Sequence, residues 1–176
     1  MSLLTKKQLE RKIINEYKKQ LTEFILTSRF NLETWEENKM YRKKKNIKCI
    51  YCAPDPISLK IPLETELYVL EMNNTENRIM GIGLIKNHPI VSKYRVYNTF
   101  NYNRYVYVGK TRIDRSEMDD YEEQIMRAFD ILCFTGNKHM KRGQGLKCFP
   151  IEMIYKILKC IDLIDFIKTM FKKRIK

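Results

Sequence analysis

The sequence has few of the residues that metal and nucleotide sites need. It contains two histidines, His88 and His139, and one tryptophan, Trp35. Neither histidine begins an H-x-E motif, which excludes the zinc deaminase pattern. Cys49 and Cys52 form a C-x-x-C pair, but the chain offers no second pair to complete a tetrahedral zinc site. The glycine-containing segment 137–147 lacks the G-K-[ST] ending of a P-loop, so we expect no metal, no cofactor and no nucleotide hydrolysis.

Long apolar runs are missing as well. No run approaches the roughly 20 residues that span a bilayer, and residues 1–20 are too charged for a secretory signal. On a chain without an export signal, an odd number of cysteines predicts free thiols: Cys49, Cys52, Cys133, Cys148 and Cys160. We therefore expect a soluble, intracellular protein that is not attached to a membrane.

Positive charge is in excess. The 34 Lys and Arg residues outnumber 21 Asp and Glu residues, which gives a net charge of +13 and favours polyanionic partners. Over half of the excess lies in the stretch 78–115, where Asp114 is the one acid. Six aromatic residues crowd the same stretch: Tyr94, Tyr97, Phe100, Tyr102, Tyr105 and Tyr107. Cations interleaved with rings on extended backbone are typical of a surface that grips phosphates and stacks on bases.

A second basic segment covers residues 137–147, which carry four cations, His139 and two glycines without an acid. Glycines let consecutive backbone N–H groups converge on an anion, although an ordinary mobile basic loop has the same composition. We predict a nucleic-acid partner, either DNA or RNA, and leave the oligomeric state open. The residues expected to contact the nucleic acid are Lys86, Lys93, Arg95, Tyr102, Arg104, Tyr105, Tyr107, Lys110, Arg112, Lys138, His139, Lys141 and Arg142.

Hydrophobic periodicity and turn residues predict an α+β fold with terminal helices. The expected elements are a helix over 5–27, a short helix after Asn31, a strand over 47–53, a hairpin of 66–72 and 78–85, a second hairpin of 94–100 and 104–110, a helix from 119 to about 135, and a last helix from Pro150 onward. Short strands followed by helices predict a small, curved, mostly antiparallel sheet or an open β-barrel. We expect a single domain over 1–176, with an N-terminal helix in 1–28, a core in 30–148 and a C-terminal amphipathic helix in 150–176.

The segment Ile50-Tyr51-Cys52-Ala53, followed by ELYVLEMNNTENRIMGIGLIKN, resembles the first half of YTH and EVE domains of the PUA-like superfamily. In the YTH pattern the strand carries Trp-Cys-Ser/Thr and the hairpin returns through Gly-x-Ala. The resemblance implies a small barrel that binds nucleic acid and seats a modified base in an aromatic pocket. That pocket would be formed by Trp35, Tyr51, Gly81 and Gly83, with a tyrosine of the 94–107 group.

The abundance of Lys, Asn and Ile is similar to that of uncharacterised proteins from large, AT-rich DNA viruses. This similarity implies a location in the cytoplasm or nucleus of a host cell, or in the virion. Our leading hypothesis is a non-catalytic nucleic-acid-binding protein. One alternative is a viral genome-packaging or interaction protein, in which the charge serves only to condense nucleic acid.

A nuclease is the other alternative. Val96-Tyr97, the run Tyr107-Val108-Gly109-Lys110-Thr111 and Arg115 resemble the core of GIY-YIG nucleases, although Arg95 stands where that family has glycine. The resemblance implies a divalent metal held by a glutamate of the following helix, Glu122 or Glu123. Under this hypothesis the protein would cut nucleic acid when magnesium or manganese is present.

Overall fold

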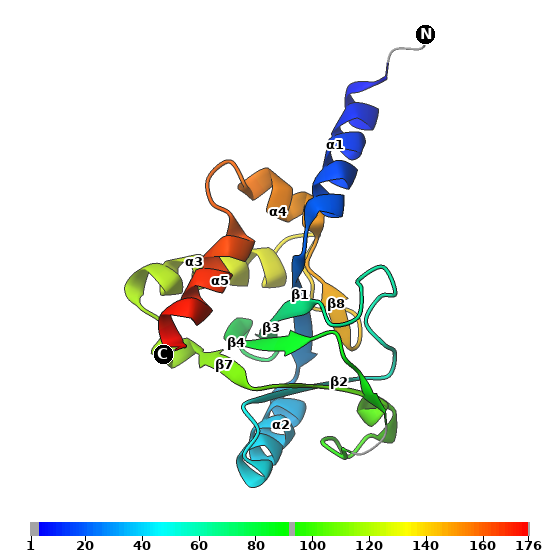
Figure 1. Cartoon of the computed structure of the whole chain (residues 1–176). Helices are drawn as coiled ribbons and strands as arrows, with labels where there is room; N and C mark the ends of the chain where they lie inside the picture. Colours follow the sequence, from blue (N-terminus) through cyan, green and yellow to red (C-terminus); the bar gives the residue numbers. More distant parts are fainter. Residues whose placement is uncertain (1–3, 92–93, 176) are drawn as a thin grey trace.

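The fold is built on two β-sheets with helices packed around them (Figure 1). The computed structural model describes residues 4–91 and 94–175. Its elements are α1 (Lys6–Gln20), β1 (Glu23–Phe30), α2 (Leu32–Lys45), β2 (Cys49–Ala53), β3 (Glu66–Asn73), β4 (Arg78–Lys86), β5 (Ile90–Val91), the 3₁₀ turn η1 (Phe100–Asn103), β6 (Tyr105–Gly109), β7 (Thr111–Asp114), the 3₁₀ turn η2 (Arg115–Glu117), α3 (Asp120–Phe134), β8 (Leu146–Cys148), α4 (Ile151–Ile157) and α5 (Leu163–Arg174). The predicted α+β class is confirmed.

The larger sheet has the strand order β7-β4-β3-β1-β8, and the smaller one β2-β6-β5. β1 and β3 run parallel, whereas the other paired strands are antiparallel, so the larger sheet is mixed. β6 continues through Lys110 into β7, which carries one extended segment from the smaller sheet to the larger. Within the described ranges the two sheets remain separate ladders and do not close into a barrel.

β1 begins at Glu23, within the residues 5–27 that were predicted to form the first helix. The capping box of Thr5 and Gln8 starts α1 as expected, but the helix ends at Gln20 and not near Thr27. β1 lies between β3 and β8, and its residues Phe24 to Ser28 are buried in succession. Phe24 continues the helical spacing of Tyr17 and Leu21 by coincidence, although it belongs to a strand that is covered on both faces.

The second predicted hairpin is also wrong, because residues 94–100 do not form a strand. The side chain of Asn103 takes the place of a ladder partner. Its Oδ1 accepts hydrogen bonds from the N–H groups of Val96 (2.8 Å) and Tyr97 (2.9 Å), and its Nδ2 donates to the Tyr97 carbonyl (2.7 Å). Side-chain bonds of this kind satisfy the backbone locally and compete with sheet formation.

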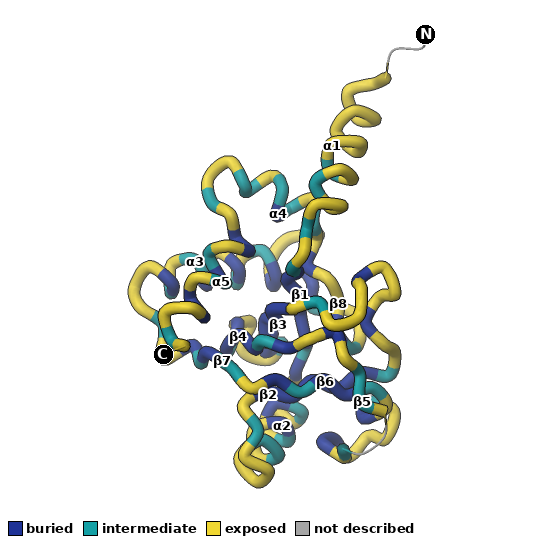
Figure 2. Tube along the Cα trace, viewed as in Figure 1, coloured by how far each residue is buried: buried dark blue, intermediate teal, exposed yellow. Residues whose placement is uncertain are grey.

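Two apolar cores lie on the two faces of the larger sheet. On β3, Tyr68, Leu70 and Met72 pack toward α3, α4 and α5, while Leu67 and Val69 pack toward α2, β2 and β6. Figure 2 shows the contrast between the buried strands and α1, which projects from the body and has no buried residue.

The last predicted helix is divided in two. α4 ends at Ile157, and Asp162 starts α5 because its side chain accepts hydrogen bonds from the N–H groups of Ile164 and Asp165. Helical periodicity persists across the break, so spacing alone did not reveal it. Among the described helices, none has the length and apolar composition needed to cross a membrane.

Candidate nucleic-acid interface

A cavity of about 300 Å³ lies where the end of β1 meets the start of α2. Its volume is at the lower end of the range for small-molecule sites and suits a group the size of one base. Backbone and side chains from six parts of the chain form its wall: Ser28, Arg29, Phe30, Asn31, Glu33, Thr34, Glu37, Cys52, Asn74, Tyr97, Asn98, Thr99, Tyr102, Gly143, Gln144 and Gly145.

The first turn of α2 is fixed at the cavity by a reciprocal cap. The Asn31 side chain accepts a hydrogen bond from the Thr34 N–H (2.8 Å), and the Thr34 hydroxyl accepts one from the Asn31 N–H (3.0 Å). Glu37, one turn further, accepts a hydrogen bond from the Asn98 N–H (3.2 Å) and so ties the 97–102 segment to the helix. The wall thus combines a helix N-terminus with carboxylate and amide groups.

Arg29 and Asn74 hold the basic 137–147 segment against the cavity. Arg29 Nε donates to the Met140 carbonyl, and Asn74 Nδ2 donates to the Lys141 carbonyl at 3.0 Å. Arg29 Nη1 and Asn74 Oδ1 are buried without a hydrogen-bond partner in the described structure. Burial lowers the pKa of Arg29. Because an unsatisfied buried polar group costs about 1–3 kcal/mol, these contacts are made at some cost in stability.

Two tyrosines complete the wall. Tyr97 is buried, and its hydroxyl accepts a hydrogen bond from Asn38 Nδ2 (3.0 Å), which also donates to the Ile50 carbonyl (2.9 Å). Burial raises the pKa of Tyr97, so its hydroxyl stays protonated. Tyr102 is half-buried and keeps part of its ring open at the cavity.

Several of the predicted cations belong to the two segments that line this cavity. Arg95 and Arg104 are exposed on the segment that carries Tyr97 and Tyr102, and the Arg104 guanidinium lies 5.7 Å from the centre of the Tyr105 ring. Lys138, His139, Lys141 and Arg142 belong to the segment that ends in the cavity-lining Gly143. Lys141 Nζ donates to Asn77 Oδ1 (2.7 Å), and the Lys141 N–H donates to His139 Nδ1 (3.4 Å).

Other predicted cations lie elsewhere. β6 pairs Ala53 with Tyr105 at its cavity end and Cys49 with Gly109 at its far end. Lys110 follows Gly109 and is therefore about 17 Å along the strand from Tyr105. Lys86 lies beyond the β4–β7 ladder near that same far end, because Leu84 pairs with Thr111. Lys93 falls outside the described residues.

The predictions for Tyr107 and Arg112 are wrong. Tyr107 is fully buried, and its hydroxyl accepts a hydrogen bond from the Ile57 N–H at 2.9 Å, so its ring cannot stack on a base. Arg112 forms ion pairs with Glu71 (2.7 Å) and Asp114 (2.8 Å), and 9% of its side chain is exposed. A guanidinium held in this way is not free to bind phosphate.

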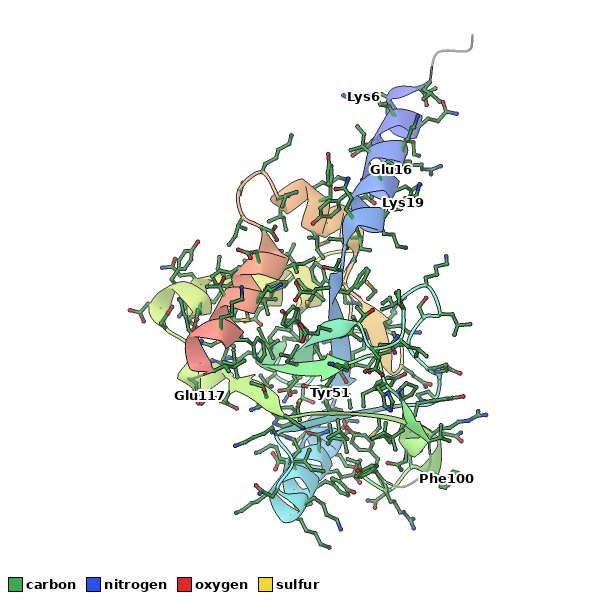
Figure 3. The ribbon with its side chains drawn as sticks, viewed as in Figure 1. Lys6, Glu16, Lys19, Tyr51, Phe100 and Glu117 are labelled. Atoms are coloured by element: carbon green, nitrogen blue, oxygen red, sulfur yellow. The ribbon has the colours of Figure 1, made fainter. Side chains whose placement is uncertain are left out.

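The predicted base pocket is also wrong in its residues. Tyr51 lies in the interior (Figure 3), where it is fully buried and donates a hydrogen bond to Glu71 Oε1 (2.8 Å). Gly83 makes room for the Tyr51 ring, and Gly81 for Arg112 and Glu71, so neither glycine leaves space for a ligand. Trp35 packs edge-on against Phe30 with 5.2 Å between ring centres. Tyr51, Trp35, Gly81 and Gly83 therefore take part in internal packing, and none of them lines the cavity between β1 and α2.

The metal ligands suggested by the nuclease resemblance are engaged with arginines. Glu123 pairs with Arg115 (2.5 Å), which also pairs with Asp130 (3.0 Å). Glu122 pairs with Arg174 at 2.6 Å. Among the residues that the structure describes, no group of three or more His, Cys, Asp or Glu side chains could hold a metal ion.

Arg29 and Asn74 were missed by sequence reasoning. A weak signal for Arg29 does exist, because it is a charged residue two positions before Asn31, the cap of a helix. No local pattern marks Asn74, which lies in the polar turn after β3. Their partners Met140 and Lys141 are 111 and 67 residues away in the sequence.

The thiol in the cavity wall should be unreactive. Burial raises the pKa of Cys52 to about 12, and those of Cys49 and Cys133 likewise. Because the thiolate is the nucleophile, we expect a thiol-reactive dye at pH 8 to label the exposed Cys160 first and Cys148 more slowly. Peptide mass mapping would identify the labelled sites, with urea-unfolded protein as the control for all five. Rapid labelling of Cys52 in the folded protein would contradict its burial.

No protein-family model matches the chain, no curated protein matches it, and no solved structure matches it. The resemblance to YTH and EVE domains therefore stays a prediction that depends on short segments.

Proposed function

We propose that the protein binds single-stranded nucleic acid and seats one base in the cavity between β1 and α2. The observation that carries this proposal is a cavity whose wall combines polar side chains with Tyr102, and which is formed by two segments that carry exposed arginines. The polar atoms suit the edge of a base, and the cations suit the phosphates that flank it. Neither feature alone would favour a nucleotide polymer over a small polar ligand.

The cavity wall offers both hydrogen-bond donors and hydrogen-bond acceptors to the edge of a base. Asn98 and Gln144 line the cavity and are exposed, and their amide side chains can both donate to and accept from a base edge. Tyr102 supplies an aromatic surface beside these groups. Proteins that read unpaired bases combine stacking on a ring with hydrogen bonds to the base edge.

A single strand fits the cavity better than a duplex. The cavity is recessed between β1, α2 and the 97–102 and 143–145 segments, so a base must leave its helical stack to enter it. Extruding a base from a duplex costs a few kcal/mol, whereas in a single strand most of that cost is absent. The protein should therefore prefer single-stranded over double-stranded oligonucleotides of the same sequence.

Tyr102→Ala should weaken binding of a single-stranded oligonucleotide by about 1–3 kcal/mol, or roughly 5- to 150-fold, because it removes the ring available for stacking. Fluorescence anisotropy with DNA and RNA oligonucleotides, plain and base-methylated, would measure this change and show which base is preferred. Tyr121→Ala is the matched control, since Tyr121 is an exposed tyrosine on α3 that does not line the cavity.

Equal affinities of wild-type protein and Tyr102→Ala would refute the cavity as the base site. If binding then also fell steeply with salt and ignored base identity, the protein would instead condense nucleic acid through its charge, as the packaging hypothesis predicts.

A further inference from the structure

A second surface of positive charge lies at the other end of α2. A shallow groove of about 540 Å³ runs between the second half of α2, the start of β2 and β7. Its lining is Trp35, Lys39, Arg42, Lys43, Asn46, Ile47, Lys48, Arg112, Asp114 and Glu117. Glu117, at the edge of this groove, is labelled in Figure 3.

The two acids of the groove are already engaged. Asp114 accepts hydrogen bonds from Arg112 Nη1 (2.8 Å) and from the Ser116 N–H (3.1 Å). Glu117 Oε2 accepts one from the Asp114 N–H (2.7 Å). Asp114 therefore offsets Arg112, and among the described residues neither acid forms an ion pair with a lysine.

Five exposed lysines gather at this end of the molecule. Lys43, Lys44 and Lys45 form the last turn of α2, and Lys48 precedes β2. The antiparallel register pairs Cys49 with Gly109, so the next position outward places Lys48 opposite Lys110. Within residues 4–91 and 94–175 none of the five forms an ion pair.

The helix dipole explains only part of this charge. Cations in the last turn of a helix stabilise its C-terminus, which accounts for Lys43 to Lys45. Lys48 and Lys110 lie beyond the helix and gain nothing from its dipole. Crowding of like charges raises the free energy of the folded protein, and a bound polyanion would relieve it.

We propose that this groove and the five lysines bind the phosphates of the same strand whose base enters the cavity, an inference that rests on the proposed function. α2 connects the sites, because Thr34 lines the cavity and Lys43 lines the groove. They are nine residues apart, or about 14 Å along the axis, and face opposite flanks of a helix about 10 Å wide. The strand crosses the exposed face of α2, and at the 3.4 Å spacing of stacked bases the path takes roughly seven nucleotides.

The test compares oligonucleotides of two lengths. A fluorescein-labelled single strand of three nucleotides can occupy the cavity alone, whereas one of twelve can reach both sites. In the variant Lys43→Ala/Lys48→Ala/Lys110→Ala, affinity for the twelve-nucleotide strand should fall at least tenfold and the salt slope should decrease by about 2, while affinity for the short strand stays unchanged. All three side chains are exposed, so the variant should fold, and circular dichroism would verify this.

The matched control removes the same charge from α1, in Lys6→Ala/Lys7→Ala/Lys12→Ala. Lys6 lies at the outer end of this projecting helix (Figure 3), and the control should bind both strands like the wild type. Equal losses in the two triple variants, or no loss in the groove variant, would overturn the inference.

Two further outcomes separate this inference from the function on which it rests. If wild-type protein bound neither oligonucleotide, both proposals would fall. If the long strand bound in a Tyr102-dependent manner but the groove variant kept full affinity, only the groove assignment would fall. If the groove variant kept its affinity for the long strand but lost binding to vesicles of anionic phospholipid, the groove would be a membrane-binding surface, and the inference would be overturned.

Discussion

Arg112→Met is expected to destabilise the protein by about 3–5 kcal/mol, because it leaves the buried carboxylate of Glu71 without its cation. One per cent of the Glu71 side chain is exposed, and Arg112 donates to both of its oxygens, through Nε at 2.9 Å and Nη2 at 2.7 Å. Burial opposes the charged guanidinium, yet the Glu71 carboxylate raises the pKa of Arg112 above its usual value. Urea unfolding followed by circular dichroism would measure the loss as a lower midpoint at unchanged slope.

The double variant Glu71→Gln/Arg112→Met provides the control. The carboxamide removes the uncompensated charge and keeps an acceptor for the Tyr51 hydroxyl, which donates to Glu71 Oε1 at 2.8 Å. We expect it to recover more than half of the stability lost by Arg112→Met alone. A double variant as unstable as the single one would show that lost packing, and not the buried charge, causes the effect.

Gly83→Ala should cost about 3 kcal/mol, because the added methyl group has no space. It would overlap the hydroxyl of Tyr51 and lie 2.8 Å from Cζ of that ring. Tyr51 is fully buried and bonded to Glu71, so its ring cannot retreat without breaking that hydrogen bond. Overpacking of a rigid core typically costs 1–3 kcal/mol, and the lost hydrogen bond adds to it. Thermal and urea unfolding would measure the change.

A double-mutant cycle with Tyr51→Phe tests the cause. Removing the hydroxyl takes away the nearest obstacle, so Gly83→Ala should cost at least about 1 kcal/mol less in the Tyr51→Phe background than in the wild type. Additive costs would mean that the methyl group is accommodated by movement of the backbone and not of the ring.

The sequence predicted those helices and strands that are determined by residues close to one another in the chain. The predicted starts of α1, α2 and α3 agree with the structure, and so does the hairpin of β3 and β4 around the polar turn at 73–77. β1 could not be recognised, because its run of buried residues reflects neighbours on both sides that lie far away in sequence. Residues 94–100 had the composition of a strand, but one side chain, Asn103, satisfied the backbone that a partner strand would have needed.

The candidate site likewise has parts that neighbouring residues indicate and parts that depend on distant contacts. Composition identified the basic and aromatic segments, and Tyr102, Arg95, Arg104 and Arg142 do lie in the cavity wall or on the segments that form it. Composition could not distinguish Tyr102 from Tyr107, since the two have the same residue type and similar neighbours, but Tyr102 is half-buried and Tyr107 is fully buried. The positions of Arg29 and Asn74 depend on contacts with residues that are 111 and 67 positions away in the sequence. A pattern of neighbouring residues does not reveal such contacts.

The position of β1 between β3 and β8 also sets an order of events during synthesis. β1 can pair with β3 once residue 73 has emerged from the ribosome, but its other edge waits for residues 146–148. At about 5–20 residues per second, ribosomes need roughly 4–15 s for the intervening stretch. During this interval the nascent chain carries an apolar strand with an open edge, which is a template for pairing with other chains. The emergence of β8 ends that exposure, and the segment just before it then closes over Arg29 to form the cavity.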